Sequence, residues 1–140
     1  MEDVEQRVRA SFAKQQAMTT CGIECVRVEP GVVELALHHA PAITQQHGFV
    51  HAGILATALD SACGYAAFSL MPIDAGVLTI EFKINLIAPA RGPLFQIVAT
   101  VLKSGRTISV VEGRATSDGK LIASMTATVM TIVDRPDVTG

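Results

Sequence analysis

The alternation of apolar and polar residues predicts a chain built mainly from β-strands. Apolar residues recur at about every second position in four segments after residue 76: VLTIEFKINLI, LFQIVATVLKSG, TISVVEGRATS and KLIASMTATVMTIV. A period of two is typical of strands that bury one face. The Asp118-Gly119 pair between the last two segments indicates a tight hairpin.

The N-terminal part adds a short helix and two more strands. Apolar residues recur every four positions from Val4 to Phe12, so we predict an amphipathic helix over residues 3–16. From Cys21 the period is two, and its phase slips by one residue near Cys25. One extra residue in a strand has this effect, so we interpret the slip as a β-bulge. A Pro-Gly turn then leads into a second strand, VVELALHH.

The segment 52–70 is the candidate for one long helix. It contains no proline, Pro72 marks its end, and it is apolar nearly all round. Such a helix must be buried on most sides. The apolar run is long enough for a membrane span of about 20 residues. However, Asp60 lies near its centre and no Lys or Arg cluster flanks it, so we predict no membrane span.

The predicted order α-β-β-α-β-β-β-β defines an α+β fold. We expect a single domain over residues 1–140, in which an antiparallel sheet of five to six strands wraps the long helix. Hydrophobic residues make up 49% of the chain and charged residues 17%, which is enough for a core. The net charge of −2 and the lack of a basic run argue against nucleic-acid binding. Three cysteines without a secretory segment indicate a cytoplasmic protein with reduced thiols.

Asp60 is the only ionisable carboxylate or amine between Ala52 and Ile73. In a structural interpretation it caps a loop or pairs with a buried base. A position in mid-helix removes the capping role, and the helix offers no Lys or Arg as a partner. In a functional interpretation it lines a cleft, where a desolvated carboxylate can act as a general base. We favour the functional interpretation.

The start of the helix supplies a second candidate element, in the sequence GFVHAG. The N–H groups of Ala52 and Gly53 point out of a helix N-terminus, where they can stabilise an oxyanion. The alternative, that the glycines serve only turn geometry and close packing, stays open. Ala52 and Asp60 are eight residues apart, or about 12 Å along a helix, so they cannot contact one carbonyl carbon together. Two antiparallel helices from two chains can, which predicts a symmetric dimer with two clefts.

The run Gln45-Gln46-His47-Gly48-Phe49-Val50-His51-Ala52-Gly53, with Asp60 nine positions after His51 and Gly64 beyond it, resembles the signature of hotdog-fold thioesterases. The most similar group is the PaaI-like acyl-CoA thioesterases of the phenylacetic acid degradation type. The resemblance covers nearly the whole chain, including VLTIEFKINLIAPA and LKSGRTISVVEGR. It implies a hotdog domain that hydrolyses acyl-CoA or aryl-CoA without metal or cofactor. It also implies a homotetramer built from two dimers.

The resemblance assigns a role to each motif residue. Asp60 would be the general base on water or the nucleophile on the thioester. The Ala52 N–H would be the main oxyanion donor, with His51 shaping the turn. Thr79 would help to orient the water. Gln45 stands where many PaaI-like members have Asn, and its amide can bind the thioester oxygen or position water.

Coenzyme A carries phosphates, so the resemblance requires basic residues near the mouth of the cleft. The candidates are Arg91 in the loop PARGP and the residues Lys103, Arg106 and Thr107 in KSGRT. Arg106 is the first choice, because guanidinium binds phosphate in a bidentate fashion. The alternative is that these are ordinary solvated turn residues.

Other candidate sites are weaker. His38 and His39 are adjacent in a strand and face opposite sides, so we predict no metal site. Cys63, three residues after Asp60, is interpreted as core packing rather than as a nucleophile. Two rival functions remain: a catalytically silent acyl-CoA-binding module, and a hotdog dehydratase or hydratase.

Overall fold

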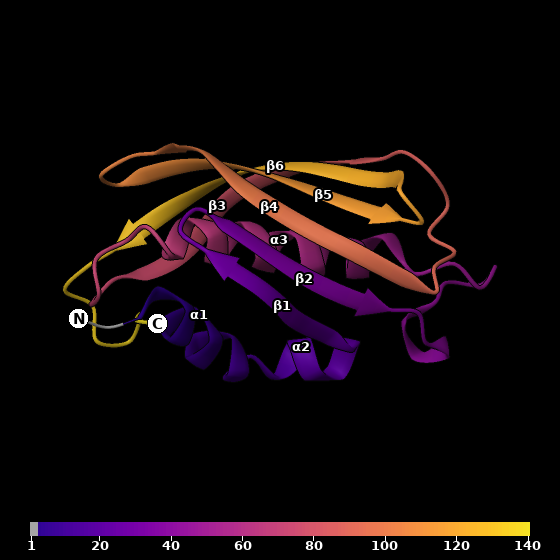
Figure 1. Cartoon of the computed structure of the whole chain (residues 1–140), viewed down its shortest axis with the longest axis horizontal. Helices are drawn as coiled ribbons and strands as arrows, with labels where there is room; N and C mark the ends of the chain where they lie inside the picture. Colours follow the sequence, from indigo (N-terminus) through magenta and orange to yellow (C-terminus); the bar gives the residue numbers. More distant parts are fainter. Residues whose placement is uncertain (1–2) are drawn as a thin grey trace.

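The computed structural model describes residues 3–140 and shows an antiparallel sheet that curves over one long helix (Figure 1). The helices are α1 (Val4–Ala13), α2 (Gln16–Cys21) and α3 (Ala52–Phe68), with a short 3-10 helix, η1 (Pro41–Ile43). The strands are β1 (Ile23–Glu29), β2 (Val32–His38), β3 (Gly76–Leu86), β4 (Leu94–Ser104), β5 (Ile108–Ser117) and β6 (Lys120–Ile132). Their order in the sheet is β1-β2-β4-β5-β6-β3. The predicted α+β architecture is therefore confirmed.

The core lies between α3 and the concave face of the sheet. Alternate residues of β2 point inward and are fully buried, among them Val33 and Leu35. They face a helix whose Leu55, Leu59 and Phe68 are also buried. This is the arrangement expected of a helix that is apolar nearly all round. None of the helices in residues 3–140 is long and apolar enough to cross a membrane.

Two bulges change which face of a strand looks inward. The pairing of β1 with β2 shifts between Cys25 and Arg27, so the bulge predicted near Cys25 is confirmed. A second shift, between Thr79 and Glu81, interrupts the pairing of β3 with β6. An extra residue at such a point moves the following side chains to the opposite face. The second bulge lies beside the centre of α3.

The predicted helix over residues 3–16 is interrupted in the structure, and the strand predicted from Cys21 begins later. A second helix, α2, ends at Cys21 and buries Met18 against the core. Gly22 ends this helix with a left-handed φ of 72°, a conformation that glycine adopts without steric cost. The first strand residue is then Ile23. The alternation that began at Cys21 therefore belongs partly to a helix end.

The N-terminal helix is tied to the end of α3 by one side chain. The Arg7 guanidinium donates hydrogen bonds to the carbonyl oxygens of Phe68, Met71 and Pro72 at 2.9–3.1 Å. It also lies 4.7 Å from the centre of the Phe68 ring. The last carbonyls of a helix have no partner within the helix, and a cation there is favourable. Arg7 therefore fixes α1 against α3.

We expect Arg7→Met to lower the free energy of unfolding by about 2 kcal/mol, because hydrogen bonds to helix-end carbonyls are lost. Urea unfolding followed by circular dichroism measures this change. Arg135→Met is the matched control, since Arg135 pairs only with the exposed Asp137 in the structure, and its unfolding midpoint should stay close to that of the wild type. Equal midpoints for the two variants would contradict the role of Arg7.

Candidate active site

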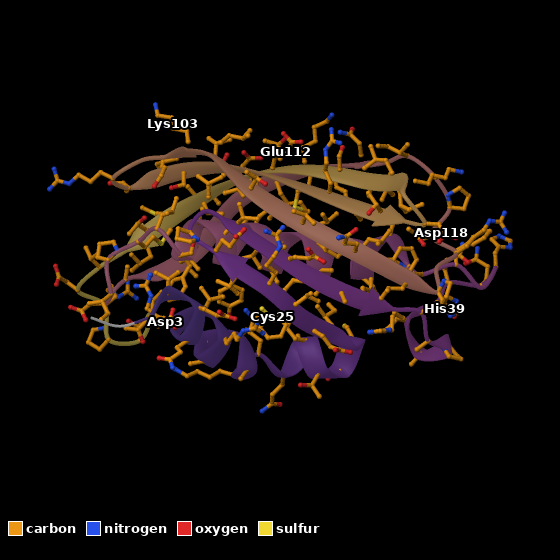
Figure 2. The ribbon with its side chains drawn as sticks, in the orientation of Figure 1. Asp3, Cys25, His39, Lys103, Glu112 and Asp118 are labelled. Carbon is orange, nitrogen blue, oxygen red and sulfur yellow. The ribbon has the colours of Figure 1, made fainter. Side chains whose placement is uncertain are left out.

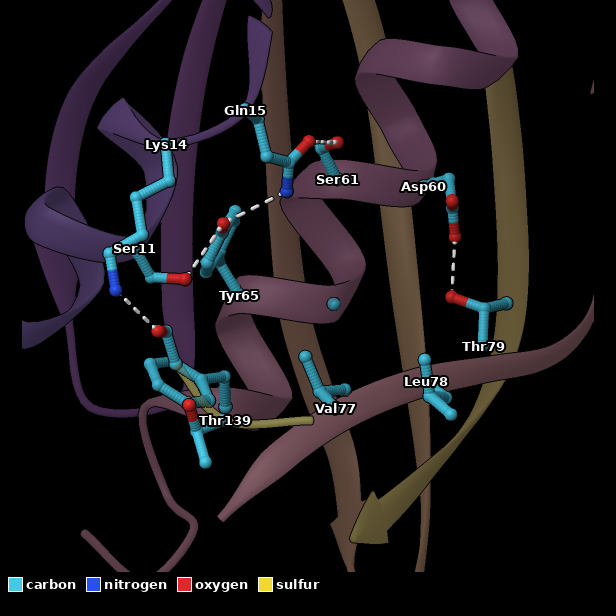
Figure 3. Close-up of a pocket in the computed structure, with 13 residues that line it drawn as sticks. Ser11, Lys14, Gln15, Asp60, Ser61, Tyr65, Val77, Leu78, Thr79 and Thr139 are labelled. Atoms are coloured by element: carbon cyan, nitrogen blue, oxygen red, sulfur yellow. Dashed lines mark hydrogen bonds between the residues drawn. The ribbon is translucent and has the colours of Figure 1, made fainter. Parts of the chain in front are cut away.

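Asp60 lies on the flank of α3 that faces β3. Its side chain is only partly buried, and its Oδ1 accepts a hydrogen bond from Thr79 Oγ1 at 2.7 Å (Figure 3). Two of the residues that the resemblance assigned to catalysis, Asp60 and Thr79, are therefore in direct contact. A hydroxyl that donates to one carboxylate oxygen leaves the other oxygen free to accept a proton.

The bulge in β3 is what directs Thr79 toward the helix. Before the bulge, Thr79 pairs with Val129, and after it, Phe82 pairs with Ala127. Val129 and Ala127 are fully buried on the side of α3, and directly paired residues share a face. Thr79 and Phe82 are three positions apart, yet both face α3. Uninterrupted alternation with Phe82 would place Thr79 on the outer face.

A cavity of about 450 Å³ opens beside Asp60. It extends along α3 between β3 on one side and the α1–α2 junction on the other (Figure 3). It is lined by Ser11, Lys14, Gln15, Asp60, Ser61, Gly64, Tyr65, Phe68, Val77, Leu78, Thr79, Thr139 and Gly140. Among these residues, only Asp60 and Thr79 were predicted from the sequence to have a role in the site.

One wall of this cavity is a connected set of polar side chains. Tyr65 Oη accepts a hydrogen bond from Gln15 Nε2 at 2.9 Å and lies 3.1 Å from Ser11 Oγ. Ser61 Oγ is 3.4 Å from Gln15 Oε1. Tyr65 is the only tyrosine of the chain and lies on α3, whereas Gln15 and Ser11 are fifty residues or more away in the sequence. No local pattern could indicate that these residues meet.

The N-terminus of α3 has one engaged and one free N–H group. His51 is the N-cap, and its Nδ1 accepts a hydrogen bond from the Gly53 N–H at 2.9 Å. The Ala52 N–H donates to no acceptor within residues 3–140. Two N–H groups were predicted to point out of the helix. That of Gly53 is bonded to the N-cap side chain, because an N-cap accepts from N–H groups that have no partner within the helix. Ala52 remains available.

A second cavity of about 570 Å³ lies at this helix N-terminus. It is lined by Gln45, Phe49, Val50, His51, Ala52, Leu55, Leu86, Ile87, Ala88, Pro89 and Ala90. Gln45 Oε1 accepts hydrogen bonds from the N–H groups of His47 and Phe49. The amide NH2 of Gln45 is thereby left as a donor. Within one chain, the predicted residues are thus divided between this cavity and the cavity beside Asp60.

The basic candidates also fall into two groups. Arg91 lies next to the second cavity, with its guanidinium 5.0 Å from the centre of the Phe49 ring. Lys103, Arg106 and Thr107 belong to the β4–β5 hairpin, where Lys103 projects from the surface (Figure 2). The two groups are separated by the length of β4, 11 residues or about 35 Å. One chain does not bring them together.

Two other candidate sites from the sequence are the Cys63 thiol and the histidine pair His38 and His39. Burial raises the pKa of the Cys63 thiol to about 12, and the charge of Asp60 adds to the effect, so this thiol is not a nucleophile at neutral pH. The interpretation of Cys63 as core packing is confirmed. His38 pairs with Glu24 at 3.0 Å, and His39 contacts the Gly48 carbonyl instead. No group of three or more His, Cys, Asp or Glu side chains in residues 3–140 could hold a metal ion.

Comparisons of the sequence and of the fold with known proteins indicate the same family. The thioesterase superfamily model matches residues 47–123. A crystal structure of a thioesterase family protein from Silicibacter pomeroyi is 51% identical, with a TM-score of 0.90, and the match covers 94% of this chain and 99% of that one. The medium/long-chain acyl-CoA thioesterase YigI of Salmonella typhimurium is 26% identical over 125 residues, or 78% of this chain and 81% of YigI.

The Escherichia coli PaaI protein from the phenylacetic acid degradation operon is 18% identical, with a TM-score of 0.86 over 92% of this chain and 93% of that one. At this identity the similarity concerns the fold alone. The predicted hotdog thioesterase fold is confirmed by these structures. Sequence and fold together place this chain in the thioesterase superfamily, as a thioester hydrolase.

Proposed function

We propose that the protein hydrolyses a coenzyme A thioester to a free carboxylate and coenzyme A, with Asp60 as the catalytic carboxylate. The observation that carries this proposal is the hydrogen bond from Thr79 to Asp60 at the edge of a cavity. The name of the relative YigI, an acyl-CoA thioesterase, supports the choice of substrate.

The chemistry needs one proton acceptor and one oxyanion donor. Thr79 holds Oδ1 of Asp60, and Oδ2 takes a proton from water as the water oxygen attacks the thioester carbon. The carbonyl oxygen gains negative charge and accepts from the Ala52 N–H and the Gln45 amide. When the carbon–sulfur bond breaks, the proton on Asp60 passes to the coenzyme A sulfur. In the alternative course, Asp60 attacks the carbon itself and coenzyme A leaves as the thiolate. Water then hydrolyses the resulting mixed anhydride, which regenerates Asp60 and releases the carboxylic acid, and the proton freed as the acid ionises neutralises the thiolate.

The cavity beside Asp60 and the cavity at the Ala52 N–H lie next to each other if two chains pair through β3. The outer edge of β3 pairs with no strand in residues 3–140, while Arg9 covers the outer edge of β1 through the carbonyls of Cys25 and Val26. An uncovered edge strand is a template for pairing with another chain. Large apolar side chains on β3 are 42–56% exposed, namely Leu78, Ile80, Phe82 and Leu86.

The register of such a pair follows from the centre of the strand. We place the two-fold axis at Glu81, the middle residue of β3, which pairs positions whose numbers add up to 162. Val77, which lines the cavity beside Asp60, then faces Asn85 of the partner subunit. The next residue, Leu86 of the partner subunit, lines the cavity at Ala52. The dimer therefore joins each Asp60 cavity to the helix N-terminus of the other chain.

The same two-fold axis reverses the two ends of the molecule. The β4–β5 hairpin with Lys103, Arg106 and Thr107 then points toward the end at which the partner subunit's Arg91 lies. We include all four residues in the coenzyme A site on this basis. The family resemblance extends the assembly to a tetramer of two such dimers.

Asp60→Asn should lower kcat for acyl-CoA hydrolysis by roughly 10²- to 10⁴-fold, because the proton acceptor is lost while the shape is kept. Release of thiol from a panel of acyl-CoA and aryl-CoA thioesters measures this effect. Asp118→Asn in the β5–β6 turn is the matched control and should retain activity. Full activity of Asp60→Asn would remove Asp60 from the mechanism. Binding without turnover by the wild type would instead indicate a silent binding module.

Phe82→Lys should convert the dimer to monomers and abolish hydrolysis, because a charge is introduced into the β3 contact. Light scattering gives the mass, and thiol release gives the activity. Val26→Lys, at an equally exposed apolar position on the opposite sheet edge, should leave the mass and activity unchanged. A monomeric variant with full activity would show that the site is complete within one chain.

Arg106→Gln should raise KM for acyl-CoA about tenfold with little change in kcat, since a phosphate contact is lost far from the reacting bond. The increase should shrink at high salt, where charge contacts are screened. Arg114→Gln, which removes an exposed arginine of β5 paired with Glu112, is the control. Equal KM values for the two variants would assign Arg106 to the solvated surface.

A further inference from the structure

The cavity beside Asp60 runs over a glycine in the middle of α3. Gly64 is buried, yet a Cβ built on it would meet no atom within 4 Å outside its own stretch of helix. Glycine is a poor helix former, and alanine would fit this space. The helix therefore presents bare backbone to the cavity at the position where a side chain would narrow it.

The cavity has a definite length from the catalytic carboxylate. Gly64 is one helical turn beyond Asp60, about 6 Å, and Phe68 is about one turn further. Thr139 and Gly140 lie at the far end, where the Lys14 Nζ donates to the Gly140 carbonyl oxygen at 2.8 Å (Figure 3). A group that starts at Asp60 thus reaches the contact between Lys14 and Gly140 after about two turns, roughly 12 Å.

The two sides of the cavity differ in polarity. Val77 and Leu78 of β3 form the apolar side. Ser11, Gln15 and Tyr65 form the polar side next to Gly64, and their hydroxyl and amide groups bond to one another. A plain alkyl chain would strip water from these groups and offer no hydrogen bond in return, which is unfavourable. An acyl group with an oxygen at this depth would replace the water.

We propose that the acyl group lies over Gly64 with its far end against Ser11, Gln15 and Tyr65, so that the preferred substrate carries a short acyl group with a hydroxyl or carbonyl oxygen near that end. This inference rests on the proposed function for the position of the thioester at Asp60. It separates the protein from a thioesterase for medium and long alkyl chains, the specificity in the name of its relative YigI.

The test measures binding in a protein that leaves the thioester intact. Isothermal titration of the Asp60→Asn variant with acetyl-, hexanoyl-, 6-hydroxyhexanoyl- and dodecanoyl-CoA gives the four affinities. We expect 6-hydroxyhexanoyl-CoA to bind about tenfold more tightly than hexanoyl-CoA, which is the gain expected from one added hydrogen bond. We expect dodecanoyl-CoA to bind more weakly than either ligand. Dodecanoyl-CoA binding as tightly as hexanoyl-CoA would overturn the proposed preference for a short acyl group.

Variants in the same background assign the effect to residues. Tyr65→Phe should abolish the preference for the hydroxylated ligand, whereas Thr126→Val, which removes an exposed hydroxyl of β6, should keep it. Gly64→Leu should lower the ratio of hexanoyl-CoA to acetyl-CoA affinity at least tenfold, and Gly64→Ala, which needs no rearrangement, should lower it less. Unchanged ratios in both Gly64 variants would place the acyl group elsewhere.

Failure of the proposed function has a different signature. If wild-type protein releases no thiol from any of the four thioesters, hydrolysis is refuted, while the affinities still decide where the acyl group lies. If thiol is released but the affinities ignore Gly64 and Tyr65, hydrolysis stands and the acyl site is refuted.

Discussion

The structure depends on one requirement, that α3 be covered on nearly every side. A helix with almost no polar face cannot stay in water, and the curved sheet covers most of its circumference. The α1 helix, held by Arg7, covers part of the remainder. The flank that holds Asp60 is left beside the edge strand β3. The only charged position of the helix therefore lies on a flank that is only partly covered.

This requirement explains why the candidate site and the proposed subunit contact lie on one surface. Exposed apolar side chains on β3, such as Ile80 and Phe82, border the flank of Asp60. In the proposed dimer, a second copy that covers them would also close the flank and expel water from the carboxylate. Removal of water strengthens hydrogen bonds to a developing oxyanion. In this proposal, assembly and catalysis both depend on the same uncovered edge of β3.

The sequence predicted the elements well because their signals are local. The strand period, the Asp118-Gly119 turn and the phase slip at Cys25 each depend on a few adjacent residues. The short helix α2 was missed because the alternation around Cys21 imitates a strand, and only the left-handed Gly22 marks the true boundary. Local patterns do not predict the boundary where one element is followed directly by another, as α2 is by β1.

Within the site, the limits of sequence reasoning have a different physical origin. Alternation along VLTIEFKINL groups Thr79 with the charged Glu81 and Lys83, and only the resemblance, not the pattern, selected Thr79. The bulge that turns Thr79 inward is a property of its pairing with β6. The contact of Gln15 with Tyr65 likewise depends on how α1 is docked. Both require the tertiary fold.

The division of α3 between two cavities gives the helix two separate tasks. Its first turn offers the Ala52 N–H, which the cap at His51 leaves free by binding Gly53 instead. Eight residues later the helix carries Asp60, and four residues after that it has a glycine, Gly64, with no side chain. A straight helix cannot fold its own N-terminus back onto its middle. The separation that keeps these two groups apart within one chain also leaves free the stretch beyond Asp60, where we propose that the acyl group lies.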